Sequence, residues 1–146
     1  MARINRVGIC KKGTISLQDV TNLAKSNPNF KKGGAIVTFT GIVRGYMHSG
    51  KEVQKLEIEA NEDEANKALA RISEDLQAKP GVIDVLINHL VGEFYVGEDL
   101  VYVVVVGKSR RNVFQVLEEA VERYKKEATI WKKEYLKDGT SHWISE

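Results

Sequence analysis

The spacing of apolar residues along the chain predicts three helices. The first is expected over residues 17–26, after an N-cap pattern at Ser16, and the second runs from Asn61 to just before Pro80. The third begins at Ser109. In each segment, apolar residues recur three or four positions apart, which is typical of a helix with one buried face. These residues are Leu17, Val20, Leu23 and Ala24, then Ala65, Ala68, Leu69, Ile72 and Leu76, then Val113, Leu117, Ala120, Val121 and Tyr124.

Alternating or β-branched apolar runs predict the strands. They cover residues 4–9, 35–44, 53–60, 82–90, 100–106 and two short tail segments near 128–135 and 142–145. The run 100–106 is almost continuous valine, so it is expected at the centre of a sheet. The strand at 53–60 is expected to pair with the strand before it, across a polar, mobile loop. A tight excursion is expected at residues 91–99.

The resulting order, β-α-β-β-α-β-β-α-β-β, indicates the α+β class with a mixed, mainly antiparallel sheet. A length of 146 residues fits one domain over 1–146, with an ordinary 42% of hydrophobic residues. The net charge of +2 argues against a general nucleic-acid coat. No apolar run is long enough for a membrane span, and no secretory core is expected near the first residues. With Cys10 as the single cysteine, a cytoplasmic location is the simplest expectation.

The C-terminal segment Ile130-Trp131-Lys132-Lys133-Glu134 places lysines beside an indole in a predicted strand. Lys125 ends the preceding helix a short connection earlier. Two amines held against an apolar wall can grip an anion or act as acid and base once desolvated. The alternative is a surface strand whose lysine stems lie along Trp131, because lysine is mostly an exposed residue.

A second basic group, Lys108-Ser109-Arg110-Arg111, lies where the valine strand meets the third helix. Unpaired N–H groups and arginines at a helix start form an anion site, or they are a solvated basic turn. Arg44, at the end of a buried strand, is a further candidate. His48, His89 and His142 lack metal-ligand spacing, so no bound metal is expected. Cys10 is interpreted as a structural thiol, with a low-pKa nucleophile as the alternative.

Several of these motifs together resemble the large, catalytic subunit of molybdopterin synthase, the MoaE type. The resemblance spans about residues 34 to 145 and rests on motifs that occur in one order. They are the strand Gly34-Ala35-Ile36-Val37-Thr38-Phe39-Thr40-Gly41-Ile42-Val43-Arg44, then Leu56-Glu57-Ile58-Glu59-Ala60, Val91-Gly92-Glu93, Ile130-Trp131-Lys132-Lys133-Glu134, Gly139 and Trp143-Ile144.

The resemblance implies an α/β hammerhead fold and a sulfur transferase of molybdenum cofactor biosynthesis. Such enzymes convert cyclic pyranopterin monophosphate (precursor Z) to molybdopterin. The sulfur arrives as a thiocarboxylate at the C-terminal Gly-Gly of a small ubiquitin-like subunit, whose tail enters a pocket of the large subunit. Large subunits of this family form a homodimer within a heterotetramer. The enzyme needs no cofactor of its own, since the pterin is its product, and no membrane or nucleic-acid partner is expected.

By the same resemblance, the catalytic lysines correspond to Lys125 and Lys132, and the substrate-binding residues include Arg44 and Phe39. Lys132 is expected to act on the thiocarboxylate carbonyl or to carry protons during thiol addition, while Lys125 lowers its pKa by like-charge proximity and orients the pterin. Arg44 is expected to bind the phosphate or a developing oxyanion.

The chain departs from the family pattern at three positions. Ser109 replaces the histidine of a His-Arg pair, Leu90 replaces the arginine of another, and Thr129 replaces a proline. Two alternatives therefore stay open: a family member with altered catalysis, and a non-catalytic module that binds RNA or another anion through its basic and aromatic residues.

Helix geometry adds an expectation about assembly. Arg110 and Lys125 lie at opposite ends of the third helix, about 22 Å apart at 1.5 Å per residue. One small pterin cannot contact both within a subunit. A composite site is therefore expected, with Arg44, Lys125 and Lys132 from one chain and Arg110 and Arg111 from a symmetry mate.

Overall fold

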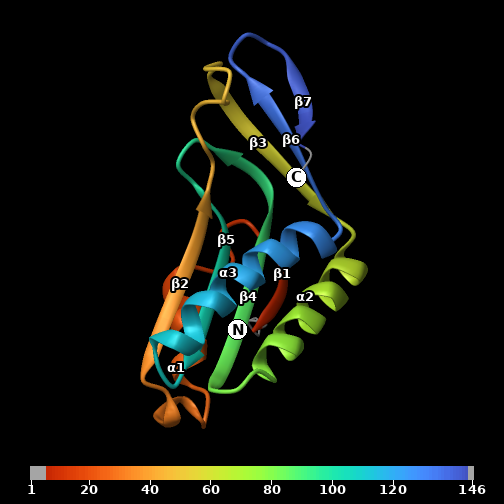
Figure 1. Cartoon of the computed structure of the whole chain (residues 1–146). Coiled ribbons are helices and arrows are strands. Elements are labelled where there is room, and N and C mark those ends of the chain that lie inside the picture. The colour runs from red at the N-terminus through yellow and green to blue at the C-terminus, as the bar shows by residue number, and fades with distance from the viewer. Residues whose placement is uncertain (1–5, 145–146) are drawn as a thin grey trace.

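The computed structural model describes residues 6–144 and confirms the predicted order of helices and strands (Figure 1). A short 3-10 helix, η1, adds to that order. The elements are β1 (Val7–Lys11), α1 (Leu17–Lys25), η1 (Phe30–Lys32), β2 (Ala35–Ile42), β3 (Val53–Ala60), α2 (Glu62–Gln77), β4 (Val82–Tyr95), β5 (Asp99–Gly107), α3 (Arg110–Glu127), β6 (Ile130–Leu136) and β7 (Ser141–Ile144). Residues 4 and 5 of the first predicted strand and residue 145 of the last lie outside the described residues.

The strands form a single mixed sheet in the order β2-β5-β4-β3-β6-β7, and β1 is added alongside β4. Only the β1–β4 pair is parallel among the described strands; the other pairs are antiparallel. The predicted class, α+β with a mainly antiparallel sheet and three main helices, is confirmed. The valine strand β5 lies between β2 and β4 with residues 100–107 buried, as predicted for an inner strand.

The long strand β4 accounts for two predictions that were wrong. It continues through the expected excursion at residues 91–95, and only residues 96–98 form the turn. Gly92, with a φ of +135°, bends the strand instead of ending it. The end of β4, residues 92–95, pairs with one edge of β3, and β6 pairs with the other. β3 therefore does not pair with the preceding strand β2, contrary to the prediction from the sequence. The connection 45–52 closes on itself through a bridge between Tyr46 and Glu52.

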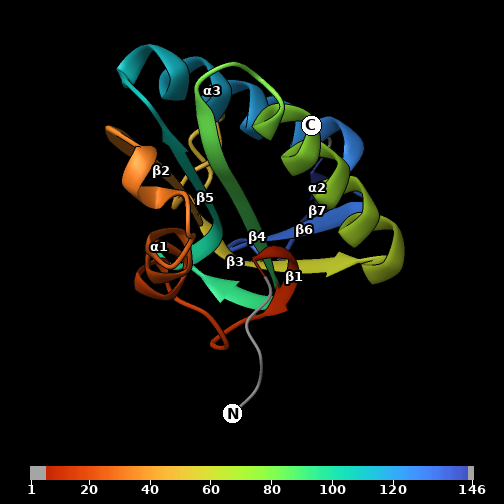
Figure 2. The same ribbon diagram turned by 90° about the horizontal axis from the view of Figure 1, so that it is seen from below.

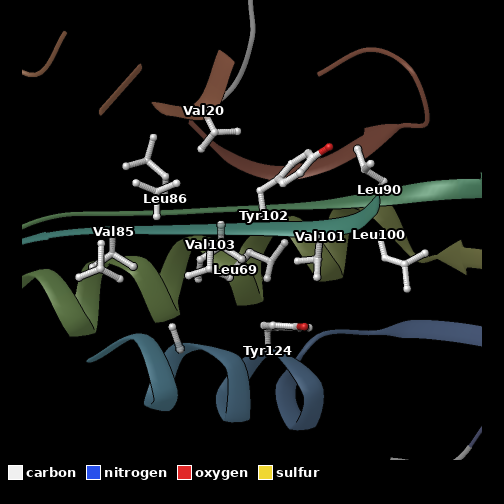
Figure 3. Close-up of a cluster of buried hydrophobic side chains, with 14 of the residues drawn as sticks. Val20, Leu69, Val85, Leu86, Leu90, Leu100, Val101, Tyr102, Val103 and Tyr124 are labelled. Atoms are coloured by element: carbon white, nitrogen blue, oxygen red, sulfur yellow. The ribbon is translucent and has the colours of Figure 1, made fainter. Parts of the chain in front are cut away.

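Helices cover both faces of the lower part of the sheet. α1 lies on one face, and α2 and α3 lie side by side on the other (Figures 1 and 2). Figure 3 shows the same division in the core, with Val20 and Tyr102 on the α1 side and Leu69, Val103 and Tyr124 on the α2–α3 side. No helix within residues 6–144 is long and apolar enough to cross a membrane.

The upper part of the sheet, formed by β3, β6 and β7, extends beyond the helices (Figure 1). α3 ends against this extension, and the chain turns into β6 after only Ala128 and Thr129. This junction brings the end of a helix, the start of a strand and the middle of β4 to one place.

Candidate active site

A cleft with two chambers opens at this junction. The inner chamber, about 120 Å³, is lined by His89, Tyr124, Lys125, Ala128, Ile130, Lys132 and Ile144. The outer chamber, about 420 Å³, is lined by Ile42, Val43, Arg44, His48, Leu56, Leu100, Lys125, Lys132, Glu134 and Ile144. Because Lys125, Lys132 and Ile144 line both, the chambers are neighbouring parts of one cleft.

The two predicted lysines reach this cleft from different elements. Lys125 lies in the last turn of α3, next to Tyr124, whose side chain is buried against the sheet (Figure 3). Lys132 lies on β6, and its register opposite Ile58 and Ile144 directs it to the face of the upper sheet that carries the buried Leu56 and Ile58, here called the covered face. The structure therefore brings both amines to the walls of the same two chambers.

The neighbouring residues of β6 point the other way, because side chains alternate along a strand. Trp131 is 49% exposed and does not line the cleft, so the expectation that its indole forms a wall beside Lys132 is wrong. The Nζ of Lys133 lies 5.3 Å from the ring of Tyr135 and 5.6 Å from that of Trp143. The apolar wall beside Lys132 comes instead from Tyr124, Ile130 and Ile144.

Arg44 enters the outer chamber from the end of β2. Val43 is buried, and its backbone N–H donates to the Glu98 carbonyl at 3.0 Å, which fixes where the next residue emerges. The Nε of Arg44 lies 3.4 Å from Oε2 of Glu134, while the arginine side chain stays 45% exposed. The Arg44 side chain therefore stays partly exposed at the cleft, which suits an anionic ligand.

Glu134 is a site residue that sequence reasoning left without a role. Its side chain is buried, and Nε2 of His142 lies 3.1 Å from its Oε1. Its carboxylate thus lies between Arg44 and His142 of β7 at the wall of the outer chamber. The signal was available: Glu134 lies two residues after Lys132 on the same strand and therefore on the same face.

His89 is a second residue of the cleft; in the sequence it stands out only as the histidine of the His89-Leu90 pair, without a role at the site. It lies in the buried middle of β4 and packs edge-on against Tyr124, with ring centroids 5.6 Å apart. Burial, together with the positive charge of Lys132, lowers the pKa of His89 to about 3. Its Nδ1 lies 2.9 Å from the Leu90 carbonyl, and its Nε2 has no hydrogen-bond partner among residues 6–144. The resemblance to a His-Arg pair was a signal for this position, but its apolar sequence neighbours did not indicate that it lines a cleft.

The remaining predicted residues lie away from the cleft. Arg110 and Arg111 are exposed at the first turn of α3, at the opposite end from Lys125. Phe39 packs against the core from β2 and does not line either chamber. The cleft of one protomer thus contains Arg44, Lys125 and Lys132 of the predicted set.

The interpretation of Cys10 as a structural thiol fits its surroundings. It is partly buried, and burial raises the pKa of the thiol, the opposite of what a reactive thiolate needs.

Among residues 6–144, no group of three histidine, cysteine or acidic side chains could hold a metal ion.

Comparison with known proteins assigns the chain to a family. The model of the family described as MoaE protein matches residues 10–127, which is more than half of the chain. This chain belongs to the MoaE family. The expected resemblance to molybdopterin synthase catalytic subunits, enzymes of molybdenum cofactor biosynthesis, is confirmed.

Individual relatives agree with this assignment. The molybdopterin synthase catalytic subunit of Nostoc sp. is 36% identical over 132 residues, which are 90% of this chain and 77% of that protein. A probable molybdopterin synthase of Haloferax volcanii is 37% identical over 131 residues, which are 89% of this chain but only half of that protein.

Solved structures confirm the fold. The crystal structure of molybdopterin synthase from Staphylococcus aureus superposes with a TM-score of 0.86 at 30% identity, covering 99% of this chain and 100% of that chain. A complex of subunits 1 and 2 of molybdopterin-converting factor from Helicobacter pylori shares the fold at 22% identity, with a TM-score of 0.75 over 97% of this chain and 92% of that one.

Proposed function

We propose that this MoaE-family chain transfers sulfur to cyclic pyranopterin monophosphate (precursor Z) and so forms molybdopterin. The observation that carries the proposal is the meeting of Lys125 and Lys132 at one cleft, with Arg44 in its outer chamber. The outer chamber of about 420 Å³ is within the usual range for small-molecule sites, and it contains a guanidinium for the phosphate.

The two lysines have different roles in this proposal. Lys132, directed into the cleft by β6, acts on the carbonyl of the thiocarboxylate or carries protons during thiol addition. Lys125, at the shared wall of the chambers, orients the pterin and disfavours a second positive charge beside it. Arg44 binds the phosphate or stabilises an oxyanion, and Glu134 holds the guanidinium in place.

The donor in this proposal is a small ubiquitin-like subunit ending in a Gly-Gly thiocarboxylate. Such a donor explains why the chain needs no nucleophilic cysteine of its own, since Cys10 is partly buried and its pKa is raised. The Helicobacter complex of two subunits supports a two-component enzyme. The reducing cytoplasm is the compartment that a thiocarboxylate donor suits.

The assay is direct. The chain is mixed with thiocarboxylated small subunit and precursor Z, and molybdopterin is measured. We expect product with the unmodified chain and a large loss with Lys125→Ala and with Lys132→Ala. Full activity in both variants, or no product with the unmodified chain, contradicts the proposal.

A homodimer with composite sites completes the proposal. Arg110 and Arg111 lie at the far end of α3, so they reach a pterin only in the cleft of a symmetry mate. Exposed apolar side chains suit such an interface: Ile36 and Ile42 on the outer strand β2, and Phe114 on α3.

Mixing two inactive variants tests this arrangement. Lys132→Ala and Arg110→Ala homodimers are dissociated, mixed and reassociated. If each site takes residues from both chains, a mixed dimer has one intact site, and about a quarter of the wild-type rate returns. If Lys132 and Arg110 serve the same site within one chain, mixing restores nothing.

A further inference from the structure

The inner chamber contains a buried hydrogen-bond acceptor to which the lysine chemistry gives no role. The Nδ1 of His89 lies 2.9 Å from the Leu90 carbonyl oxygen. A carbonyl oxygen can only accept, so Nδ1 carries the ring hydrogen and Nε2 presents a lone pair. This Nε2 is fully buried and has no hydrogen-bond partner among the described residues. Buried polar atoms are normally satisfied, and His89 is one of the residues that line the inner chamber, so this orphaned acceptor points to a ligand that donates.

The surroundings keep His89 in this state. Its ring packs edge-on against Tyr124, at an interplanar angle of 72°, and its Nδ1 bonds to the Leu90 carbonyl, so two contacts orient Nε2. Burial and the charge of Lys132 lower its pKa to about 3, so near neutral pH it is uncharged and Nε2 only accepts. Lys125 and Lys132 are the charged groups that line the chamber with it. The donor must therefore come to Nε2 as an N–H or similar group.

The size of the inner chamber limits what can enter it. At about 120 Å³ it is far smaller than a usual small-molecule site, whereas the outer chamber of about 420 Å³ is large enough. The end of an extended peptide fits better, above all a glycine, which has no side chain. A terminal glycine also provides one backbone N–H beside its carbonyl carbon.

We propose that Nε2 of His89 accepts a hydrogen bond from the peptide N–H of the last glycine of the sulfur carrier, and so holds its terminal carbonyl between Lys125 and Lys132. This inference rests on the proposed function and adds to it the group that positions the donor's tail. The pterin also has ring N–H donors, so the test separates the two sources.

A binding cycle tests the contact. Gln places a side-chain acceptor near the position of the imidazole Nε2, whereas Asn is too short. The probes are a recombinant carrier ending in an unmodified Gly-Gly and the same carrier without its last glycine. For the complete carrier, we expect His89→Asn to raise the Kd roughly three- to tenfold relative to wild type. We expect His89→Gln to have a Kd near that of wild type. The truncated carrier should bind all three proteins alike. An equal Kd for His89→Asn and wild type, or the same loss with both carriers, overturns the proposal.

A second experiment changes the carrier, so its first comparison uses the unmodified chain and is free of any folding defect. A semisynthetic carrier with N-methylglycine in the last position lacks the donor, and we expect a similar loss of affinity that shrinks in the His89→Asn background. Unchanged affinity overturns the proposal. So does a His89→Asn variant that binds the pterin more weakly but the carrier normally, since the donor is then the pterin.

The proposed function is judged separately by molybdopterin formation in the unmodified chain. If the enzyme forms molybdopterin but its affinity for the carrier does not change with substitutions of His89, only the proposed hydrogen bond to the last glycine is refuted. A chain that binds the carrier through His89 but forms no product refutes sulfur transfer and leaves the contact in place.

Discussion

The two faces of the upper sheet carry the same residue types in different surroundings. On the covered face, Lys132 and Glu134 lie at the cleft with Arg44. On the outer face, Lys133 lies over aromatic rings, and Glu57 accepts a hydrogen bond from the Tyr135 hydroxyl at 2.8 Å. The adjacent lysines Lys132 and Lys133 thus lie in different surroundings. Because successive side chains of a strand point to opposite faces, only Lys132 can reach a ligand in the cleft. The composition of the motif does not distinguish them.

The largest expected difference between the faces is catalytic. Lys132→Ala should lower the rate of molybdopterin formation by about 10²- to 10⁴-fold, because it removes an amine that acts on the reacting atoms. Lys133→Ala removes an equal charge one residue away and should stay within about twofold, since its partners are surface rings. Rates at saturating carrier and pterin measure both. Equal losses would show that charge, and not the face of the strand, is what the reaction needs.

The buried carboxylate should show the next largest effect. Glu134→Gln leaves Arg44 and His142 facing a neutral amide, and we expect a loss of about 1–3 kcal/mol in the free energy of unfolding, less than for a fully buried pair because Arg44 is half-exposed. Glu57→Gln, on the outer face, should change it by less than about 0.5 kcal/mol. Urea unfolding of the three proteins measures this. A cost at Glu57 as large as at Glu134 contradicts the comparison.

The covered face should also make stability depend on pH. The pKa of His89 is about 3 in the folded chain and near 6.5 when unfolded. Below pH 6.5 His89 becomes protonated in the unfolded state but stays neutral in the folded state. The free energy of unfolding therefore falls as pH falls towards 3, with a slope of up to about 1.4 kcal/mol per pH unit. Between pH 6.5 and 5, wild type should lose about 1–2 kcal/mol more than His89→Phe, measured by urea unfolding.

The control for this effect lies on the outer face. Trp143→Phe changes no titratable group, and we expect it to keep the pH dependence of wild type. A His89→Phe variant that loses stability towards acid as steeply as wild type would show that this histidine takes up its proton in the folded state.

The sequence allowed prediction of the elements but not of how they meet. Local signals such as apolar spacing, the N-cap at Ser16 and the valine run of β5 are carried by neighbouring residues, and each was confirmed. The pairing of β3 depends on the length of β4. That length was underestimated because Gly92 was interpreted as part of a turn, whereas β4 continues through it. Within the site, motif resemblance indicated Lys125, Lys132 and Arg44. Glu134 could have been predicted from strand alternation. His89 was noted only as half of a His-Arg pair, and its position in the cleft depends on tertiary packing against Tyr124.

The smallest expected effect belongs to the outer face alone. The Nζ of Lys133 lies 5.6 Å from the ring of Trp143, which neighbours it across β6 and β7. Such a contact at a partly exposed site is worth about 0.5–1 kcal/mol. A double-mutant cycle with Lys133→Met and Trp143→Leu should give a coupling energy of that size in urea unfolding and leave sulfur transfer unchanged. If instead the coupling is absent and either change slows the reaction, the outer face takes part in binding the carrier or the pterin, and the division of labour between the two faces fails.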